Sequence, residues 1–586
     1  MSNREVADLL AAASAAYKIK DEQKNKFRSI AYDRASAAIE HLGSEVKDFW
    51  DDGKLEDVPG IGPNIAKHLD EIFKTGKSKH FNKVFLGVPP SVFEFLKITG
   101  VGPKKAIKLA KELNIKSSKG AIKRLSKSAK SGKIAEIERF GEGSQKVIAK
   151  SIKEHEARPK ERMLISQAEN IARDVVGWVS ENKSVEKIEV LGSLRRRAST
   201  VGDIDIAVAT KNPESILDHF IEYPNKTRTL GKGPHKASIV LPNNIQVDLM
   251  ATENDSFGSL LQHFTGSKHH NIALREIAQK KGLSLSEYGI KGINNLKFKI
   301  KNFKDEESFY KSLALSWIPP ELREDAGEIE AAKANKLPDL LKLSDIKADL
   351  QIHSDFDIET SHDIGDSSMV EIAKKAEKLG YQYIGFTEHN PSQRGHNERK
   401  VIELIKKKRE AINRVNTKIK IFNSMEVDIL PDGKLAIGDK ALGELDFALV
   451  SIHSSFAQSR QSMTARVLSA LSHPKVKIFA HPTARRINKR EGVELDWTKI
   501  FEFCRENNRW IEINAEPTRL DLPDYLVREA VKAGVTLTLG TDSHHVRSLE
   551  NMRYGVDVAR RGWAERKDII NARTLVEFEK VLKGGE

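Results

Sequence analysis

Residues 346–586 alternate short apolar runs with longer helical patterns, and His, Asp or Glu ends most of the apolar runs. These runs lie at 349–353, 383–389, 421–426, 447–453, 478–481, 510–514 and 536–544. Strands that alternate with helices predict parallel pairing through crossover connections. Seven such strands suggest a barrel-like closure, and folds of this kind place their sites at the carboxyl ends of the strands. The pattern therefore predicts one rim that is rich in polar ligands.

The polar side chains at these strand ends are five histidines and two acids: His353, His389, Glu426, His453, His481, Asp542 and His544. A single histidine at a strand end is usually structural, but seven such residues at successive strand ends are hard to explain as core packing. A cluster of imidazoles and carboxylates can bind two or three divalent metals such as Mn²⁺ or Zn²⁺. The implied reaction is attack of a metal-activated water on a phosphoester.

A second group of acids lies on apolar strands in the middle of the chain. Asp203 and Asp205 are two residues apart, so a strand places them on one face, and Asp248 lies in another strand pattern. Carboxylates side by side on an apolar strand repel one another unless a cation lies between them. Oxygen ligands suit Mg²⁺ or Mn²⁺, and three carboxylates can hold two metals about 4 Å apart for in-line phosphoryl displacement.

The residues before this acidic pair fit a phosphate-binding role. Gly192 and Ser193 would let backbone and hydroxyl groups approach a triphosphate, and Arg196 would neutralise charge there. An Asp-x-Asp pair alone is most often a loop or an edge strand. The Gly-Ser and arginine residues before it and the third acid after it favour a nucleotidyl-transfer site.

Three glycine pairs each precede a helical pattern in the first third of the chain: Gly60 and Gly62, Gly100 and Gly102, and a weaker copy at Gly141 and Gly143. A glycine turn that opens a helix directs free backbone N–H groups at one point. Such a point binds a phosphate oxygen without reading a base. One copy is weak evidence, but the repetition favours contacts with a nucleic-acid backbone.

The positive charge of the chain is concentrated around the second and third glycine pairs. The net charge is +14, and residues 101–150 carry 14 Lys and Arg against 4 Asp and Glu, a net of +10. A lysine-rich run is often only a solvated face. Beside the hairpins it favours a phosphate-binding surface that includes Lys104, Lys105 and Lys108.

Composition limits the class of protein. The chain has 586 residues, enough for about four domains. Its single cysteine, Cys504, excludes a disulfide scaffold and a cysteine-only zinc cluster. The amino terminus has no apolar signal core, and no uncharged apolar run reaches the length of a membrane span. We therefore expect a cytoplasmic protein without membrane association.

Together with residues 257–275, which include Phe264-Thr-Gly266-Ser, these motifs resemble the family X DNA polymerases, and the glycine pairs look like helix-hairpin-helix motifs. The resemblance implies metal-binding catalytic carboxylates at Asp203, Asp205 and Asp248. It also implies nucleotide contacts at Gly192, Ser193, Arg196, Gly202, His263, Phe264, Gly266, Asn271 and Arg275.

Two positions depart from this family. The tyrosine that lies under the sugar of the incoming nucleotide is His263 here, so we expect weaker exclusion of ribonucleotides. Members with 5′-deoxyribose-phosphate lyase activity use a Schiff-base lysine in the helix after the first glycine turn, and that position is His68 here. The adjacent Lys67 lies roughly 100° around the helix. We therefore expect weak or absent lyase activity.

The last domain resembles the polymerase-and-histidinol-phosphatase (PHP) domain, which in bacterial and archaeal members commonly gives Mn²⁺-dependent 3′→5′ exonuclease activity. The first motif departs from that family. Its His-x-His reads Gln351-Ile-His353, and the Ser-Asp-Gly that usually follows reads Asp357-Ile-Glu359. Asp355, Asp357 or Glu359 are the alternative ligands in place of the missing imidazole.

The predicted fold is multidomain, α+β and α/β, with a nucleotidyltransferase palm on a mixed sheet and a distorted (β/α)₇ barrel. The expected divisions are a helical domain with the first hairpin, a hairpin DNA-binding domain, the palm, the thumb, a mostly polar linker that includes a short helix, and the PHP domain. Their respective bounds are 1–85, 86–155, 156–255, 256–325, 326–345 and 346–586.

The function that this organisation predicts is gap-filling repair synthesis by a template-directed DNA polymerase with 3′-end processing. The expected partners are gapped or primer-template DNA and dNTPs, and we expect a monomer. The expected ions are Mg²⁺ or Mn²⁺ in the palm and Mn²⁺ or Zn²⁺ in the PHP domain. The alternatives are a non-templated nucleotidyltransferase and a DNA-binding nuclease or phosphatase with a vestigial palm.

Overall fold

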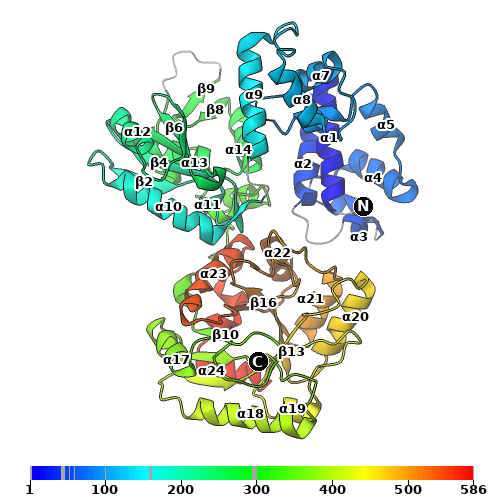
Figure 1. Cartoon of the computed structure of the whole chain (residues 1–586), viewed down its shortest axis with the longest axis vertical. Helices are drawn as coiled ribbons and strands as arrows, with labels where there is room; N and C mark the ends of the chain where they lie inside the picture. The colour runs from blue at the N-terminus through cyan, green and yellow to red at the C-terminus, as the bar shows by residue number, and fades with distance from the viewer. Residues whose placement is uncertain are drawn as a thin grey trace. The chain divides into compact units, whose positions relative to one another are not determined.

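The computed structural model describes residues 3–40, 46–51, 53–58, 60–98, 100–157, 161–293 and 300–584. These residues form two compact units (Figure 1). The first unit is all-helical and contains α1–α9, and the second contains the elements from β1 to α24. Each unit is described by itself.

The first unit packs short helices around one apolar core. Its helices are α1 (Asn3–Asp21), α2 (Lys26–Glu40), α3 (Val46–Asp51), α4 (Pro63–Thr75), α5 (Lys79–Phe85), α6 (Ser91–Phe95), α7 (Pro103–Glu112), α8 (Ala121–Lys130) and α9 (Gly141–Ala157). Helix α4 buries Ile65, Leu69 and Ile72 at helical spacing, so one face of the helix supports the core.

The first two glycine pairs open α4 and α7 in the same way. Gly60 and Gly100 have φ near +80°, a conformation that glycine adopts without strain. Gly62 and Gly102 are extended N-cap residues, each followed by proline at the first helical position. The third pair differs, because α9 begins at Gly141 and Gly143 lies inside its first turn.

The palm of the second unit is a five-stranded mixed sheet in the order β2-β4-β7-β6-β5. Its elements are β1 (Met163–Leu164), α10 (Ile165–Ser180), β2 (Lys187–Val190), α11 (Gly192–Arg195), β3 (Thr200–Val201), β4 (Ile204–Ala209), α12 (Pro213–Ile221), β5 (Arg228–Lys232), β6 (Lys236–Val240) and β7 (Gln246–Thr252). Strands β4 and β7 are the central pair and run parallel, whereas their other neighbours run antiparallel.

The thumb follows the palm, and its core continues beyond the expected boundary at residue 325. Its elements are α13 (Phe257–Thr265), α14 (Lys268–Lys280), β8 (Leu283–Ser286), β9 (Gly289–Gly292), α15 (Glu306–Ser312), the 3₁₀ turn η4 (Pro320–Leu322) and α16 (Glu328–Lys333). Ile329, Ala332 and Leu340 lie in the thumb core, and the buried Glu328 accepts from His270 (2.6 Å). The segment expected to be a linker is therefore packed structure.

The last domain has strands β10–β17 with helices around them (Figure 1). Its elements are β10 (Ala348–Ile352), α17 (Met369–Lys378), β11 (Tyr383–Phe386), α18 (Glu398–Asn413), β12 (Lys420–Asn423), β13 (Met425–Asp428), α19 (Asp439–Gly443), β14 (Ala448–Ser451), α20 (Arg460–Leu471), β15 (Val476–Phe479), α21 (Trp497–Glu506), β16 (Trp510–Asn514), α22 (Asp524–Lys532), β17 (Leu537–Gly540), α23 (Met552–Arg561) and α24 (Leu575–Leu582).

These strands form a distorted seven-stranded barrel, as predicted. Strands β12 and β13 are separated only by Ser424, and all pairings between neighbours are parallel. Single parallel bridges, His389 with Glu426 and Ile352 with Ser543, join the three-stranded and five-stranded sheets at both edges. The strands are almost entirely buried, as expected when helices cover a parallel sheet.

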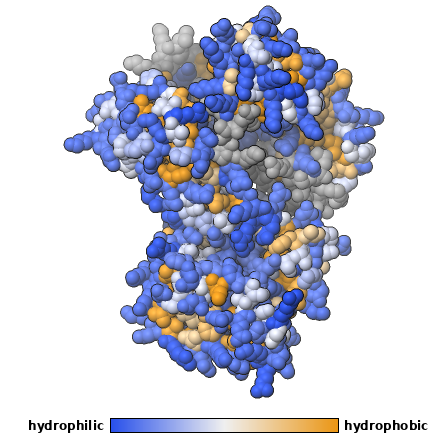
Figure 2. Space-filling view, in the orientation of Figure 1, coloured by the Kyte–Doolittle hydropathy of each residue, from blue (hydrophilic) through white to orange (hydrophobic). Residues whose placement is uncertain are grey.

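The face of the molecule in Figure 2 is mostly hydrophilic, with apolar residues in small scattered groups. Within the described residues, every helix is too short or too polar to span a bilayer.

Candidate active sites and DNA-binding hairpins

The palm places two of the three predicted carboxylates side by side on one face of its sheet, and the third lies just ahead of them in the chain. Asp205 on β4 and Asp248 on β7 are direct partners in the parallel register, so their side chains lie side by side. Asp203 lies just before β4 instead of within it, and it is exposed. Asp205 is half-buried and Asp248 is buried, which gives the site a solvent side and an apolar side.

The negative charges of the palm carboxylates favour a bound cation. Burial raises the pKa of Asp205 to about 7, and the charge of Asp248 adds to this increase. Lys236 Nζ lies 2.6 Å from Asp248 Oδ2, and Gln246 Nε2 donates to Asp248 Oδ1 (2.9 Å). An oxygen-only donor set with excess negative charge fits divalent metals.

Of the predicted phosphate-side residues, Gly192 lies directly against a site carboxylate. Gly192 has φ +60°, and a Cβ there would lie 2.7 Å from Asp205 Oδ2, so the turn requires glycine. Arg196 donates from Nε to Glu324 (2.9 Å) and from Nη1 to the Thr265 carbonyl (2.5 Å). Ser193 precedes it on α11, and a Cβ at Gly202 would lie 2.9 Å from Arg162.

The predicted nucleotide-contacting segment forms the end of α13 and the start of α14. Asn271 accepts from Gln262 (2.8 Å) and donates to the His263 carbonyl (2.7 Å), so it joins the two helices. The His263 and Phe264 rings meet edge to face at 4.8 Å. Gly266 has φ +71° and lies against Arg196, whereas Arg275 is exposed. Direct nucleotide contacts by these residues stay a prediction.

The half-buried imidazole of His263 predicts weak sugar discrimination. Burial lowers its pKa, so a neutral ring stands where the family has a phenol. We expect the substitution His263→Tyr to increase the preference for dNTPs over rNTPs by roughly tenfold, because phenol and imidazole differ in bulk and hydrogen bonding. Single-nucleotide insertion with each substrate measures the ratio of kcat/KM values. Equal ratios in the two proteins would show that His263 does not set the selectivity.

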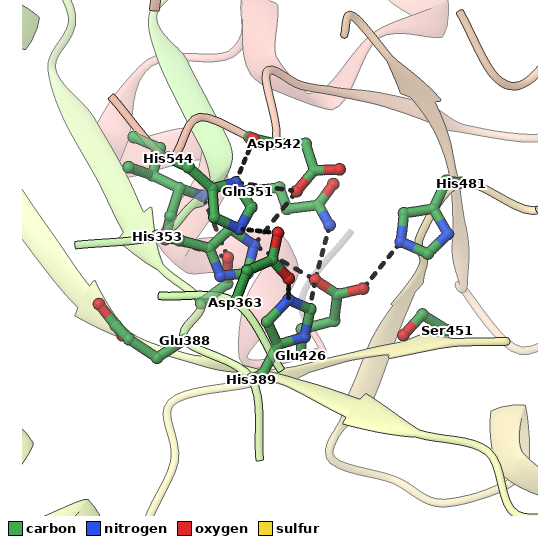
Figure 3. Close-up of polar contacts among 12 residues, drawn as sticks. Gln351, His353, Asp363, Glu388, His389, Glu426, Ser451, His481, Asp542 and His544 are labelled. Atoms are coloured by element: carbon green, nitrogen blue, oxygen red, sulfur yellow. Dashed lines mark hydrogen bonds and ion pairs between the residues drawn. The ribbon is translucent and has the colours of Figure 1, made fainter. Parts of the chain in front are cut away.

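The seven predicted ligands of the barrel converge around Glu426, as Figure 3 shows for six of them. Glu426 Oε1 lies 2.8 Å from His481 Nε2 and 3.4 Å from His453 Nε2. Glu426 Oε2 lies 3.3 Å from His353 Nε2, and Asp542 Oδ1 is also 3.3 Å from that nitrogen. The rings of His353 and His544 stack at 4.3 Å.

Three further residues complete this rim and were missed from the sequence: His362, Asp363 and Asp428. Asp428 accepts from His453 (2.7 Å) and from His362 (2.8 Å). Asp363 lies 3.6 Å from His389 Nε2 and 3.5 Å from His544 Nε2 (Figure 3). Asp428 had a detectable signal, because it lies two residues after Glu426 on β13 and so on the same face.

The expected substitutes Asp355, Asp357 and Glu359 do not join the rim. Asp355 and Asp357 are exposed, and Asp357 accepts from the Glu359 N–H (2.7 Å). Glu359 pairs with His396 (2.7 Å) and with Lys400. The expectation that one of these acids replaces the missing imidazole is therefore wrong, and the same loop brings His362 and Asp363 to the rim instead.

Gln351 occupies a fully buried place beside the cluster (Figure 3). Its Nε2 donates to Glu426 Oε2 (3.0 Å), and its Oε1 accepts from Asn514 (3.2 Å). Both ends of the amide are thus engaged in hydrogen bonds within the protein. A neutral amide held in this way is a poorer metal donor than imidazole.

The remaining donors of the rim fit divalent metals. Nδ1 of His353, Nδ1 of His389 and Nε2 of His544 are buried and make no hydrogen bond to any described residue, whereas His353 Nε2 lies between the Glu426 and Asp542 carboxylates. Burial lowers the pKa of His353, but Asp542 and Glu426 outweigh it and raise the pKa to about 10. Orphan imidazole nitrogens beside buried carboxylates are the chemistry of a metal centre.

The lysines of the second hairpin lie on or near α7. Lys104 is 3.2 Å from Glu22 and mostly exposed, Lys105 donates to the Gly100 carbonyl (3.2 Å), and Lys108 donates to the Glu138 carbonyl (2.7 Å). Surface pairs of this kind are weak and exchange readily for phosphate. The arrangement is compatible with backbone binding, which stays a prediction for these side chains.

Neutralising these lysines tests that prediction. Replacing Lys104, Lys105 and Lys108 by Gln should weaken duplex binding for all sequences alike. The slope of log K against log salt concentration should fall by about 0.9 for each lost phosphate contact. Fluorescence anisotropy at several salt concentrations gives the slope, and the exposed Lys74, Lys77 and Lys79, which lie outside that segment, provide the matched control. An unchanged slope would assign the three lysines to a solvated face.

His68 lies in a ring cluster where the family's lyase lysine would be. Tyr32 Oη bonds His68 Nδ1 (2.7 Å) and His80 Nε2 (2.9 Å), and the two imidazoles stack at 3.5 Å. The adjacent Lys67 is exposed. A Schiff base needs an unprotonated amine, so borohydride should trap little or no incised abasic DNA. Trapping in wild type as efficient as in His68→Lys would contradict this expectation.

The glycine hairpins, the palm carboxylates and the histidine-rich rim of the barrel together indicate a two-site enzyme that acts on nucleic acids. Family models match the chain in three places: a helix-hairpin-helix domain over 1–78, a DNA polymerase beta thumb over 260–324 and a PHP domain over 349–516.

Curated relatives agree with these matches. The DNA polymerase/3′-5′ exonuclease PolX of Bacillus subtilis is 34% identical over 588 residues, covering all of both chains. Probable phosphatases of Acetivibrio thermocellus (27% identical) and Thermoanaerobacter sp. (26%) each match 30% of this chain and 73% of their own length. The chain therefore belongs to the family X DNA polymerases that carry a PHP domain.

Proposed function

We propose that this protein is a template-directed, gap-filling DNA polymerase that also removes nucleotides from 3′ ends. One observation carries the polymerase assignment: Asp205 and Asp248 are register partners on the parallel strands β4 and β7, with Asp203 just ahead. The full-length similarity to a polymerase/exonuclease supports both activities.

In the palm, Asp203, Asp205 and Asp248 would hold Mg²⁺ or Mn²⁺. When bound, the metals would supply activation of the primer 3′-hydroxyl and charge neutralisation of the triphosphate. The chain's own groups prepare the site: Gly192 allows close backbone approach, Ser193 offers a hydroxyl, and Arg196 adds positive charge beside the Gly266 turn.

In the barrel, the rim residues would hold Mn²⁺ or Zn²⁺, which supply an activated water for phosphodiester cleavage. The protein contributes a fixed arrangement, because Glu426 is held by His481 and Gln351, and Asp428 is held by His453 and His362. The Gln351 amide leaves this rim one imidazole short of the family motif.

Primer extension on a DNA substrate with a single-nucleotide gap tests the proposal. With the four dNTPs supplied singly, we expect insertion only of the nucleotide complementary to the template base. Insertion of any dNTP regardless of template would indicate a non-templated transferase. Trimming without insertion would indicate a nuclease with a vestigial palm.

A further inference from the structure

Three consecutive arginines begin at the last residue of helix α11, and each extends to a different partner within the second unit. Arg195 makes two hydrogen bonds to the Glu306 carboxylate (3.0 and 2.9 Å). Arg197 pairs with Glu169, which also accepts from Tyr554 on α23 (2.8 Å). The middle arginine, Arg196, contacts both the nucleotide-binding segment and the C-terminal domain.

Arg561, the last residue of α23, closes a buried network with Arg196. Its Nη1 donates to the Arg196 carbonyl (2.7 Å) and to Glu324 Oε1 (3.0 Å), and its Nε donates to Asp524 Oδ2 (2.6 Å). Glu324 Oε1 also accepts from Arg196 Nε (2.9 Å). Two acids balance two arginines, and the Arg561 side chain is only 8% exposed. Buried charge-assisted bonds of this kind fix geometry.

The network ends at the turn that precedes α14. Arg196 Nη1 donates to the Thr265 carbonyl (2.5 Å), and Arg195 Nη1 donates to Thr265 Oγ1 (2.6 Å). A Cβ at Gly266 would lie 3.1 Å from Arg196 Nη1, so the guanidinium lies directly against this turn. Arg196 is therefore in direct contact with the Thr265–Gly266 backbone.

The domain that carries Arg561 is packed firmly against the thumb. Trp563 is a member of the thumb core, which also contains Ile329 and Leu340. Arg560 donates to Glu321 (2.8 Å) and to the Leu341 carbonyl (2.9 Å), and neither of these hydrogen bonds involves Arg196. The thumb contacts of Trp563 and Arg560 therefore hold the end of α23 in place, and the Arg560 hydrogen bonds do not involve the predicted nucleotide-binding segment 263–275.

We propose that Arg561 is a positioning residue of the nucleotidyl-transfer site, although it belongs to the phosphoesterase domain. It holds the Arg196 backbone and, through Glu324, the Arg196 side chain, and so sets the Thr265–Gly266 turn for the incoming nucleotide. This inference rests on the proposed polymerase function. It implies that nucleotide insertion depends on the structure of the barrel domain and not on its nuclease chemistry.

The test compares Arg561→Ala with Arg560→Ala, a neighbour on the same helix at the same interface. We expect Arg561→Ala to raise the KM for dNTP about tenfold or more, because small misplacements at a reacting centre are costly. Arg560→Ala should lower the melting temperature to a similar extent and leave the KM near the wild-type value. Removal of 3′ nucleotides should be unaffected in both variants.

A second variant keeps the test valid if Arg561→Ala does not fold. Arg561→Lys retains the charge, but one ammonium group cannot reproduce the planar, forked contacts to Asp524, Glu324 and the Arg196 carbonyl. It should raise the KM less than alanine does. The inference is wrong if the wild type is active and the Arg561 variants have the same KM for dNTP as Arg560→Ala. A wild type that inserts no nucleotide would refute the proposed function, and the inference would fall with it.

Discussion

Asp248→Asn should reduce single-nucleotide insertion by about a thousandfold or more, the scale expected when a charged group acts directly at the reacting centre. The substitution keeps the shape of the side chain and removes the charge that pairs with Lys236 at 2.6 Å. It leaves Asp205 without the partner carboxylate beside it in the sheet. The measurement is kcat for insertion at saturating dNTP on gapped DNA.

A matched control is Asp255→Asn, which changes an exposed carboxylate that pairs only with Lys304 in the described structure (3.2 Å). It should leave insertion unchanged. Insertion by Asp248→Asn within about tenfold of wild type would remove this carboxylate from the catalytic set, because a directly acting charge is worth more than that.

His481→Ala should reduce the removal of 3′ nucleotides by about a hundredfold or more, since loss of a residue that only supports a metal ligand already costs about 10- to 100-fold. The imidazole is fully buried, and its Nε2 bonds Glu426 at 2.8 Å. Its loss removes a predicted metal donor and one of the hydrogen bonds that hold Glu426. Gel assays of 3′-end trimming under Mn²⁺, with metal content measured by elemental analysis, check both consequences.

The control for this change is His473→Ala, a half-buried histidine on the same domain that lies 3.6 Å from Asp439. It should trim 3′ ends as wild type does. Unchanged trimming and metal content in His481→Ala would show that the rim does not use this imidazole.

The barrel and the gathering of its histidines could be predicted because parallel strands direct their carboxyl ends to one rim. That rule alone brings His353, Glu426 and His481 together, although their positions in the sequence are far apart. The same logic of register places Asp205 beside Asp248. In both cases the strand pattern predicts which side chains lie close together, and the ligand role of each side chain stays a prediction.

The features that could not be predicted lie in segments whose sequence shows no helical or strand periodicity. His362 and Asp363 belong to the loop between β10 and α17, and the sequence does not say which part of such a loop returns to the rim. The segment 326–345 looked like a linker because it is mostly polar, yet Ile329 and Ala332 are three residues apart on α16 and lie in the thumb core. Short helices with two apolar positions give little signal.

The central claim is that one chain carries two independent centres, and a single substrate can test it. A gapped DNA with a labelled primer, incubated with the complementary dNTP or without dNTP, reports insertion and trimming together. We predict that Asp248→Asn trims without inserting, that His481→Ala inserts without trimming, and that the double variant does neither. Loss of both activities in either single variant, with the fold intact, would contradict the account.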